Sequence, residues 1–381
     1  MDFGLTKEQK DIQKAAREFA RGEFDPDLAL GLEREGQYPS EIRKRACDLG
    51  FIGMHFPERY GGQELGLLEN VLVVEEFCRQ HSGIGIALSL SGFGSEMILR
   101  FGSDDQRGKY LPSITRGEGT SSVAYLEGDQ GNDLTSFKTT ATRRGNGYII
   151  SGNKSFVVNA TLPGPVIIVC QLANSARPGE TVALIAEKDI HGFTSSPLGG
   201  RVGMRMVPMA SLSLNNLEVS RGSLLGDEGQ GEFQLMNFLN EISIEAAAIG
   251  TGIAQGAFDL ALAYARQREQ FGQKIGSFEA IRDKLADMAT QIEIARLLTY
   301  RAAWSFDRNN GAPKVNYMAK MVSSETALEV AKDSLHIFGG YGYMVENRIE
   351  QFYRDASMVD IIGMPGQMDK SLIADQVIGT I

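Results

Sequence analysis

The sequence predicts an α+β protein built from three consecutive domains. We expect an N-terminal α-helical domain at residues 1–118, a middle antiparallel β-barrel or sandwich domain at residues 119–228, and a C-terminal four-helix-bundle domain at residues 229–381. Apolar residues recur at helical spacing in the first and last parts of the chain, whereas short β-branched segments separated by Gly, Pro and Asn fill the middle. With 381 residues, 43% of them hydrophobic, the chain is long enough to bury a large core.

The N-terminal domain begins with an amphipathic helix. In "TKEQKDIQKAAREFAR", Thr6 is a plausible N-cap, and Ile12, Ala16 and Phe19 recur on one face. The segments "ENVLVVEEFCR" and "GSEMILRFG" predict further helices. Loops are expected at "HFPERYGG" and around Pro112.

The middle and last domains differ in their periodicity. "GYIISGNKSFVVNA", "PVIIVCQL", "TVALIAEK" and "ASLSLNNLEVS" predict antiparallel strands. "GAFDLALAYARQREQF", "SFEAIRDKLADMATQIEIARLLTYRAAWSF" and "VNYMAKMVSSETALEVAKDSLHIF" carry apolar stripes and predict long antiparallel helices.

Charge and cysteine content narrow the class of protein. A formal charge of -10 argues against nucleic acid as the main partner. Cys47, Cys78 and Cys170 show no metal-binding spacing and are expected to be reduced, buried thiols, and the four histidines are too scattered to indicate a metal site. The N-terminus does not resemble a signal peptide, and no apolar stretch approaches the roughly 20 residues of a membrane span, so we expect a cytoplasmic protein.

Two glycine- or arginine-containing motifs are each open to two interpretations. "GGYGY", which starts at Gly339, could be a helix C-cap and turn, or could let backbone N–H groups approach a phosphate. "RQREQFGQKIGSFEAI" places Arg268 near Phe271 at a helix end, which suits either a solvated surface or a phosphate and an adenine face.

Taken together, several motifs resemble the acyl-CoA dehydrogenase family over nearly the whole chain. They are "HFPERYGGQELG", "GYIISGNKSFVVNA", "RQREQFGQKIGSF", "IFGGYGY" and "YRDA". The resemblance implies a tetramer that binds FAD and a CoA thioester, with an electron-transfer flavoprotein as a possible acceptor. It also implies a carboxylate base that removes an α-proton while the flavin accepts a hydride.

The family's residues for the ADP half of FAD, which is held largely by the neighbouring subunit, are mostly retained. His336 stands where the family has Gln. The resemblance implies cofactor-binding roles on this side for Arg268, Phe271, His336, Gly339 and Gly340, and it also implies a cofactor-binding role for Gln367.

The positions that face the subunit's own flavin ring differ from the family pattern. Leu126 and Val158 replace flavin-contacting threonines, and Phe156 keeps an aromatic surface. Each hydrogen bond lost to a buried flavin would cost about 1–3 kcal/mol. The positions implied to bind substrate are Asn132, Asn240, Ser243 and Ser91.

The family's catalytic Glu is absent. "IIGMPGQM" places Gly363 at its position, and no other base is established from the sequence. Some members carry the Glu on a bundle helix, which makes Glu241 a candidate. Glu241 and Glu245 could equally be ordinary helix carboxylates. Members acting on cyclic acyl-CoAs use an Asp in the first domain, but "GIALSLSGFGSEM" contains none.

Three hypotheses follow from this pattern. The chain is a degenerate subunit of a heteromeric dehydrogenase that completes the FAD site of a homologous partner in trans. Alternatively, it is a homotetrameric FAD enzyme that acts on a cyclic or conjugated acyl-CoA with a displaced base. A third possibility is an acyl-CoA-binding protein without redox chemistry.

Overall fold

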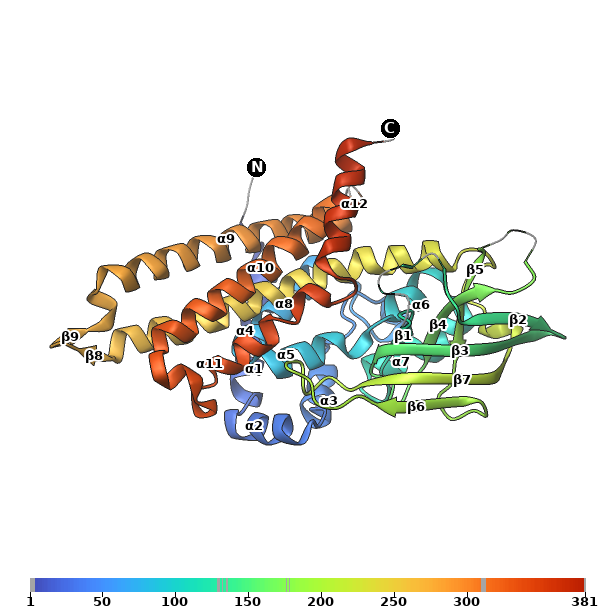
Figure 1. Cartoon of the computed structure of the whole chain (residues 1–381), viewed down its shortest axis with the longest axis horizontal. Helices are drawn as coiled ribbons and strands as arrows, with labels where there is room; N and C mark the ends of the chain where they lie inside the picture. Colours follow the sequence, from blue (N-terminus) through green and yellow to red (C-terminus); the bar gives the residue numbers. More distant parts are fainter. Residues whose placement is uncertain are drawn as a thin grey trace.

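The structure is a computed structural model, and it shows an elongated chain with a β-sheet at one end and helices along the rest (Figure 1). It describes residues 4–128, 131, 133–134, 136–175, 177, 179–309 and 313–379.

The N-terminal part is helical, as predicted. Thr6 caps the first helix in a capping box: its hydroxyl accepts from the Gln9 N–H at 3.2 Å, and the Gln9 side chain accepts from the Thr6 N–H at 3.0 Å. Phe19 packs against Phe51 and Phe77, with ring centroids 5.3 and 5.5 Å away, so the first helix is fixed by a buried aromatic cluster. The helices are α1 Lys7–Glu23, α2 Pro26–Glu35, α3 Ser40–Asp48, α4 Leu67–Gln80, α5 Ser82–Ser89, α6 Ser95–Phe101 and α7 Asp104–Thr115.

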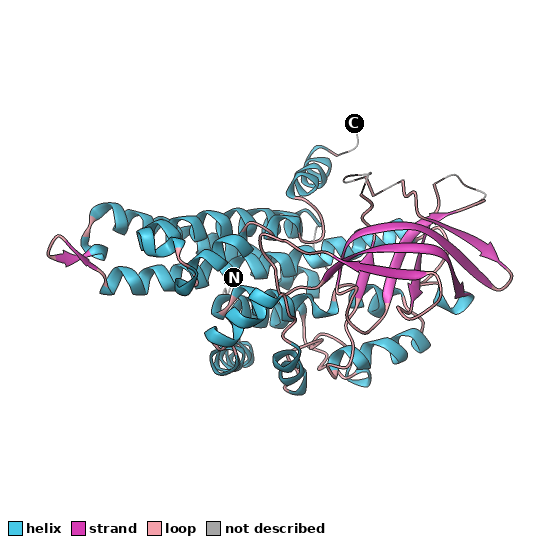
Figure 2. Cartoon of the chain, turned by 60° about the horizontal axis from the view of Figure 1, so that its bottom comes forward, coloured by secondary structure: helices cyan, strands magenta, loops and turns pink. Residues whose placement is uncertain are grey.

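The middle part is one sheet that does not close, so the predicted antiparallel β-barrel or sandwich is corrected to an open, mostly antiparallel sheet. The order is β1-β4-β2-β3-β7-β6, with β5 paired to β4, and the pairs β1–β4 and β2–β4 are parallel. Within the described residues β1 and β6 do not pair with each other, so the sheet keeps two edges (Figure 2). The strands are β1 Ser122–Ala124, β2 Thr140–Arg144, β3 Gly147–Val158, β4 Val166–Leu172, β5 Thr181–Ala186, β6 Phe193–Pro197 and β7 Met209–Ser220.

The C-terminal part contains three long helices that lie side by side, and α4 of the N-terminal part packs against α8 (Figure 1). The predicted bundle of four helices is therefore completed from another part of the chain. The elements are α8 Gly231–Gln267, the hairpin β8 Glu269–Gln270 and β9 Gln273–Lys274, α9 Glu279–Asp307, α10 Pro313–Phe338, α11 Ile349–Ala356 and α12 Gly366–Ile378. Short 3-10 turns lie at Glu58–Tyr60, Leu90–Gly92, Arg221–Ser223, Ile275–Ser277, Gly339–Tyr343, Val345–Asn347 and Val359–Ile361.

Two helical stretches are long and apolar enough to cross a membrane by composition, contrary to the expectation that no segment is. They are Ser82–Phe101 and Gly231–Gln267, and 83% and 67% of their most apolar windows are buried inside the fold. Such burial is typical of the core helices of a globular protein, because their apolar faces are already covered by other helices.

Candidate active site

The position predicted for the catalytic base is closed by neighbouring side chains. Gly363 lies in the loop before α12 with φ of +75°, and a Cβ added there would lie 2.8 Å from Cγ2 of Ile242 on α8. The Tyr125 hydroxyl donates to the Gly363 carbonyl from the residue after β1. This position therefore lacks a carboxylate and has no room for a larger side chain without movement of α8 or of the loop.

The loop that carries Gly363 is anchored by a buried ion pair. The Lys320 ammonium group donates to the Met364 carbonyl, and its Nζ lies 3.0 Å from Oδ2 of Asp369. Both charged side chains are fully buried, so the loss of either partner would leave an uncompensated charge in the core. We infer that the loop is held tightly in the conformation that only glycine readily adopts.

The three positions predicted to face a flavin ring are apolar, and they lie at or beside the C-terminal end of β3, an interior strand of the sheet. The Ser155 N–H donates to the Leu126 carbonyl at 2.8 Å, which places Leu126 beside the end of β3. Phe156 adopts φ of +54° and is 62% exposed, whereas Val158 is buried. None of the ledge side chains (Leu126, Phe156 and Val158) can donate a hydrogen bond to a flavin ring.

The carboxylate of the candidate base Glu241 already forms an ion pair with Arg100. Its carboxylate accepts two hydrogen bonds from the Arg100 guanidinium, at 2.5 and 2.6 Å. Burial raises the pKa of Glu241, and Arg100 opposes that shift. A carboxylate in a two-point ion pair with α6 is poorly placed to remove a substrate proton beside Gly363.

The side chains of two predicted substrate-binding residues on α8 already form hydrogen bonds within the protein. The Ser243 hydroxyl donates to the Leu239 carbonyl at 2.7 Å, and the Asn240 side chain accepts from the Asn316 amide at 3.0 Å. Asn132 lies outside the described residues. The hydroxyl of Ser91 is buried without a hydrogen-bond partner among the described residues, and Ser91 lines a cavity.

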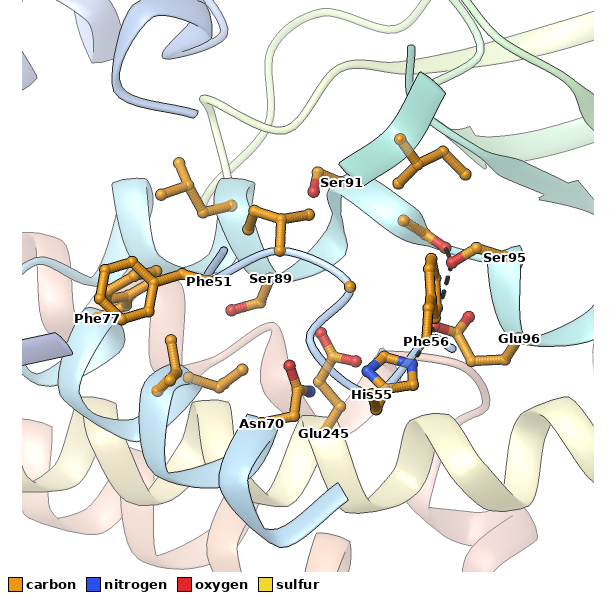
Figure 3. A pocket seen from close by; sticks show the side chains of 17 residues that line it. Phe51, His55, Phe56, Asn70, Phe77, Ser89, Ser91, Ser95, Glu96 and Glu245 are labelled. Atoms are coloured by element: carbon orange, nitrogen blue, oxygen red, sulfur yellow. Dashed lines mark hydrogen bonds and ion pairs between the residues drawn. The ribbon is translucent and has the colours of Figure 1, made fainter. Parts of the chain in front are cut away.

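That cavity encloses about 30 Å³ between α4, α5, α6 and α8 (Figure 3). The carboxyl group of Glu245 points from α8 into the space between Asn70 and His55. Burial raises the pKa of Glu245 well above its ordinary value, and the carboxyl groups of Glu96 and Glu241 raise it further, so the environment favours the protonated acid. Sequence reasoning did not single out His55, which lies within a loop motif, and it set Glu96 aside as too far along "GIALSLSGFGSEM" to act as a base.

The retained ADP-side residues gather at the far tip of the helices. Arg268, Gly339, Gly340 and Tyr341 line a hollow of about 500 Å³, in which the Arg268 guanidinium carbon lies 5.6 Å from the Tyr341 ring centroid. A Cβ added at Gly339 or Gly340 would meet nothing within 4 Å, so a ligand can approach the backbone there. Phe271, in the β8–β9 hairpin, is 94% exposed.

The other two predicted cofactor residues lie on exposed surfaces. His336 lies near the end of α10, with its Nδ1 3.7 Å from Oδ1 of Asp333. Gln367 lies on the first turn of α12, near the Gly363 loop and not in the tip hollow. Among the described residues, Arg268, Gly339 and Gly340 thus lie together at the tip, whereas the ledge residues lie at or beside the end of β3.

The helix–sheet–helix order is that of the acyl-CoA dehydrogenases, a class of flavin-dependent oxidoreductases, and family models match all three parts of the chain. Residues 6–118, 122–217 and 229–378 match the models of the acyl-CoA dehydrogenase N-terminal, middle and C-terminal domains. The chain belongs to the acyl-CoA dehydrogenase family. Members of this family bind FAD.

Individual relatives match along their full length. A probable acyl-CoA dehydrogenase of Bacillus subtilis is 33% identical over 381 residues, which cover 99% of this chain and 100% of the relative. The solved butyryl-CoA dehydrogenase of Megasphaera elsdenii superposes with a TM-score of 0.94 at 30% identity, covering 100% of both chains. A chain from a structure described as the electron transferring flavoprotein of Acidaminococcus fermentans gives 0.94 at 33% identity, again over 100% of both chains.

Proposed function

We propose that this acyl-CoA dehydrogenase-type chain is one subunit of a heteromeric, cytoplasmic assembly. In it, the tip residues complete the FAD site of a homologous subunit in trans. The partner supplies the catalytic carboxylate and an intact contact surface for the flavin ring. A CoA thioester is the substrate of the assembly, and an electron-transfer flavoprotein is its acceptor.

The observation that carries this proposal is the separation of the two half-sites. The β8–β9 hairpin, with the tip hollow beside it, lies at one end of the long axis, and the sheet lies toward the other end (Figure 1). Arg268 and Phe271 therefore cannot reach a flavin held at this chain's own ledge. They are useful for FAD binding only when they meet the ledge of another subunit.

The choice of a heteromer over a homomer is supported by the state of this chain's own ring site. Gly363 adopts a left-handed conformation against Ile242, and Leu126 and Val158 offer no donors to a flavin. In a homomer, every site would combine the tip residues of one subunit with a ledge that donates no hydrogen bond to the flavin ring. A partner with a better ledge and a carboxylate would give one competent site for each pair.

The test is to isolate the tagged chain from its own cells and to determine the composition and flavin content of the assembly. We expect an equimolar complex with a second chain of the same family, and one FAD per pair. A stable homotetramer with four bound flavins that oxidises an acyl-CoA would refute the proposal. It would favour a homomeric enzyme with a displaced base.

An assembly that binds CoA thioesters but releases no flavin on denaturation would also refute the proposal. That result would favour the non-redox binding protein. Flavin content alone therefore separates this third possibility from the other two.

A further inference from the structure

The cavity between α4, α5, α6 and α8 contains buried polar groups that have no partners. Neither ring nitrogen of His55 is hydrogen-bonded within the described residues, and the same holds for Oε2 of Glu96 and the hydroxyl of Ser91. Glu245 also makes no hydrogen bond to the described part of the chain, although its carboxyl group faces the cavity (Figure 3). Unpartnered buried polar groups are costly, so several around one cavity indicate a polar occupant.

The charges around the cavity define that occupant. No lysine or arginine is among the described residues that line it, and Arg100, the nearby cation, is paired with Glu241. The cavity presents two carboxyl groups, those of Glu96 and Glu245, and an occupant with its own carboxylate would be repelled. His55 Nε2 lies 3.6 Å from Oε1 of Glu96, so the imidazole and this carboxyl group face the same part of the cavity. A neutral group that can both donate and accept hydrogen bonds matches this lining best.

The size and walls of the cavity agree with a small polar group on an apolar body. About 30 Å³ is enough for a hydroxyl group or a water molecule. The remaining lining is mainly aromatic and aliphatic, and includes Phe51, Phe56, Phe77, Val73, Val74 and Leu88.

Residues that line the cavity are neighbours of residues at the Gly363 region, where the thioester chemistry is expected. Ser91 lines the cavity, and its backbone carbonyl accepts from the side-chain amide of Asn159 at 3.4 Å, directly after the ledge residue Val158. On α8, Glu245 lies one turn after Ile242, which contacts Gly363. A substituent on the acyl group of a CoA thioester could therefore extend from the Gly363 region toward the cavity.

We propose that the cavity binds a neutral hydroxyl substituent on the acyl group, and that Glu245 and His55 are the residues that select it. This inference rests on the proposed function only in that the chain handles a CoA thioester. It does not depend on which subunit holds the flavin. In it, the protonated Glu245 donates to the substituent oxygen, and Glu96 or His55 accepts from the substituent hydroxyl.

The experiment measures the binding of matched CoA thioesters to the assembly as it is isolated, by titration calorimetry. The probes are acyl-CoAs of equal length that end in a methyl, a hydroxyl or a carboxylate group, in a series of increasing length. We expect one hydroxyl-ended thioester to bind about tenfold or more tightly than its methyl-ended and carboxylate-ended counterparts. Equal or weaker binding of every hydroxyl-ended probe, tightest binding of a carboxylate-ended probe, or no binding of any probe would overturn the inference.

Variants separate selection by Glu245 from a structural role. Glu245→Gln keeps a neutral hydrogen-bonding group and should retain the hydroxyl preference, whereas Glu245→Leu and His55→Phe should reduce it to within about twofold. Glu232→Gln, on the exposed first turn of α8, is the matched control and should change nothing. If Glu245→Leu does not fold, His55→Phe still decides the matter, because an unchanged preference in that variant would overturn the assignment.

The outcome is distinguishable from that of the proposed function. FAD content and subunit composition are measured on the same preparation but involve the tip and the ledge, not the cavity. A heteromer with one FAD per pair that shows no hydroxyl preference would overturn only this inference. A homotetramer with a clear hydroxyl preference would overturn only the heteromeric proposal.

Discussion

Restoring the family carboxylate with Gly363→Glu should destabilise the protein without creating a dehydrogenase. A non-glycine residue in the left-handed region costs about 1–2 kcal/mol. The added Cβ would also lie 2.8 Å from Cγ2 of Ile242, and overpacking of this kind costs about 1–3 kcal/mol. Together these give a loss of about 2–5 kcal/mol in the free energy of unfolding.

A matched pair of alanine variants separates the two costs. Gly145 has φ of +56°, and a Cβ there would meet nothing within 4 Å, so Gly145→Ala carries only the conformational cost of about 1–2 kcal/mol. Gly363→Ala should lose about 1–3 kcal/mol more than Gly145→Ala. Combining Gly363→Ala with Ile242→Ala should recover most of that difference as a coupling free energy in a double-mutant cycle.

The assay is urea unfolding followed by circular dichroism, together with oxidation of saturated acyl-CoAs by the isolated assembly with an artificial electron acceptor. If Gly363→Ala were as stable as Gly145→Ala, the contact with Ile242 would not close the position. If Gly363→Glu gave the chain a new dehydrogenase activity, the inference that this locus is closed to a base would be wrong.

Three further predictions concern the tip, the loop anchor and a buried acid. Arg268→Ala should lower the affinity of the assembly for FAD by roughly 10- to 100-fold, as measured by flavin release on dilution, whereas the exposed Arg266→Ala should leave it unchanged. Lys320→Met should cost about 3–5 kcal/mol in urea unfolding because it leaves Asp369 buried and unpaired, and adding Asp369→Leu should restore much of the loss. Burial raises the pKa of Asp355 from 3.8 to about 6. The folded state therefore holds this proton at a pH where the unfolded chain has lost it, and stability should fall by about 3 kcal/mol as pH rises from about 4 to 6. Asp355→Asn should flatten that part of the profile, and an unchanged slope would contradict the assignment.

The sequence predicted what depends on local pattern. The cap at Thr6, the helical ends of the chain and the β-rich middle all follow from spacing and residue type over a few turns or strands. The exposed group around Arg268 and Gly339 could be located because its residues lie at the ends of helices, and a helix end is visible in the sequence.

The remaining features depend on contacts between distant residues. The alternation of apolar and polar residues along a strand does not show whether the first and last strands of a sheet pair with each other. An open sheet and a closed barrel therefore could not be distinguished from the sequence. Glu241 was a plausible base until Arg100, from another helix, was found beside it. The missing carboxylate at Gly363 was evident from the sequence, but the contact with Ile242 that closes the position was not.

The cavity also bears on how far this chain has lost its own site. Its unpartnered groups, such as those of His55 and Ser91, would each cost about 1–3 kcal/mol if nothing bound there. A subunit that only completed a partner's FAD site would be more stable with apolar side chains in this cavity, because such a replacement removes the cost and fills the space. The polar lining agrees with the proposal that a hydroxyl group of the substrate enters the cavity. We infer that the chain still binds an acyl group, although the base locus at Gly363 is closed. This chain would then have lost the catalytic carboxylate and kept the binding of the acyl group. The deciding observation is whether CoA thioesters bind to this chain's own cavity.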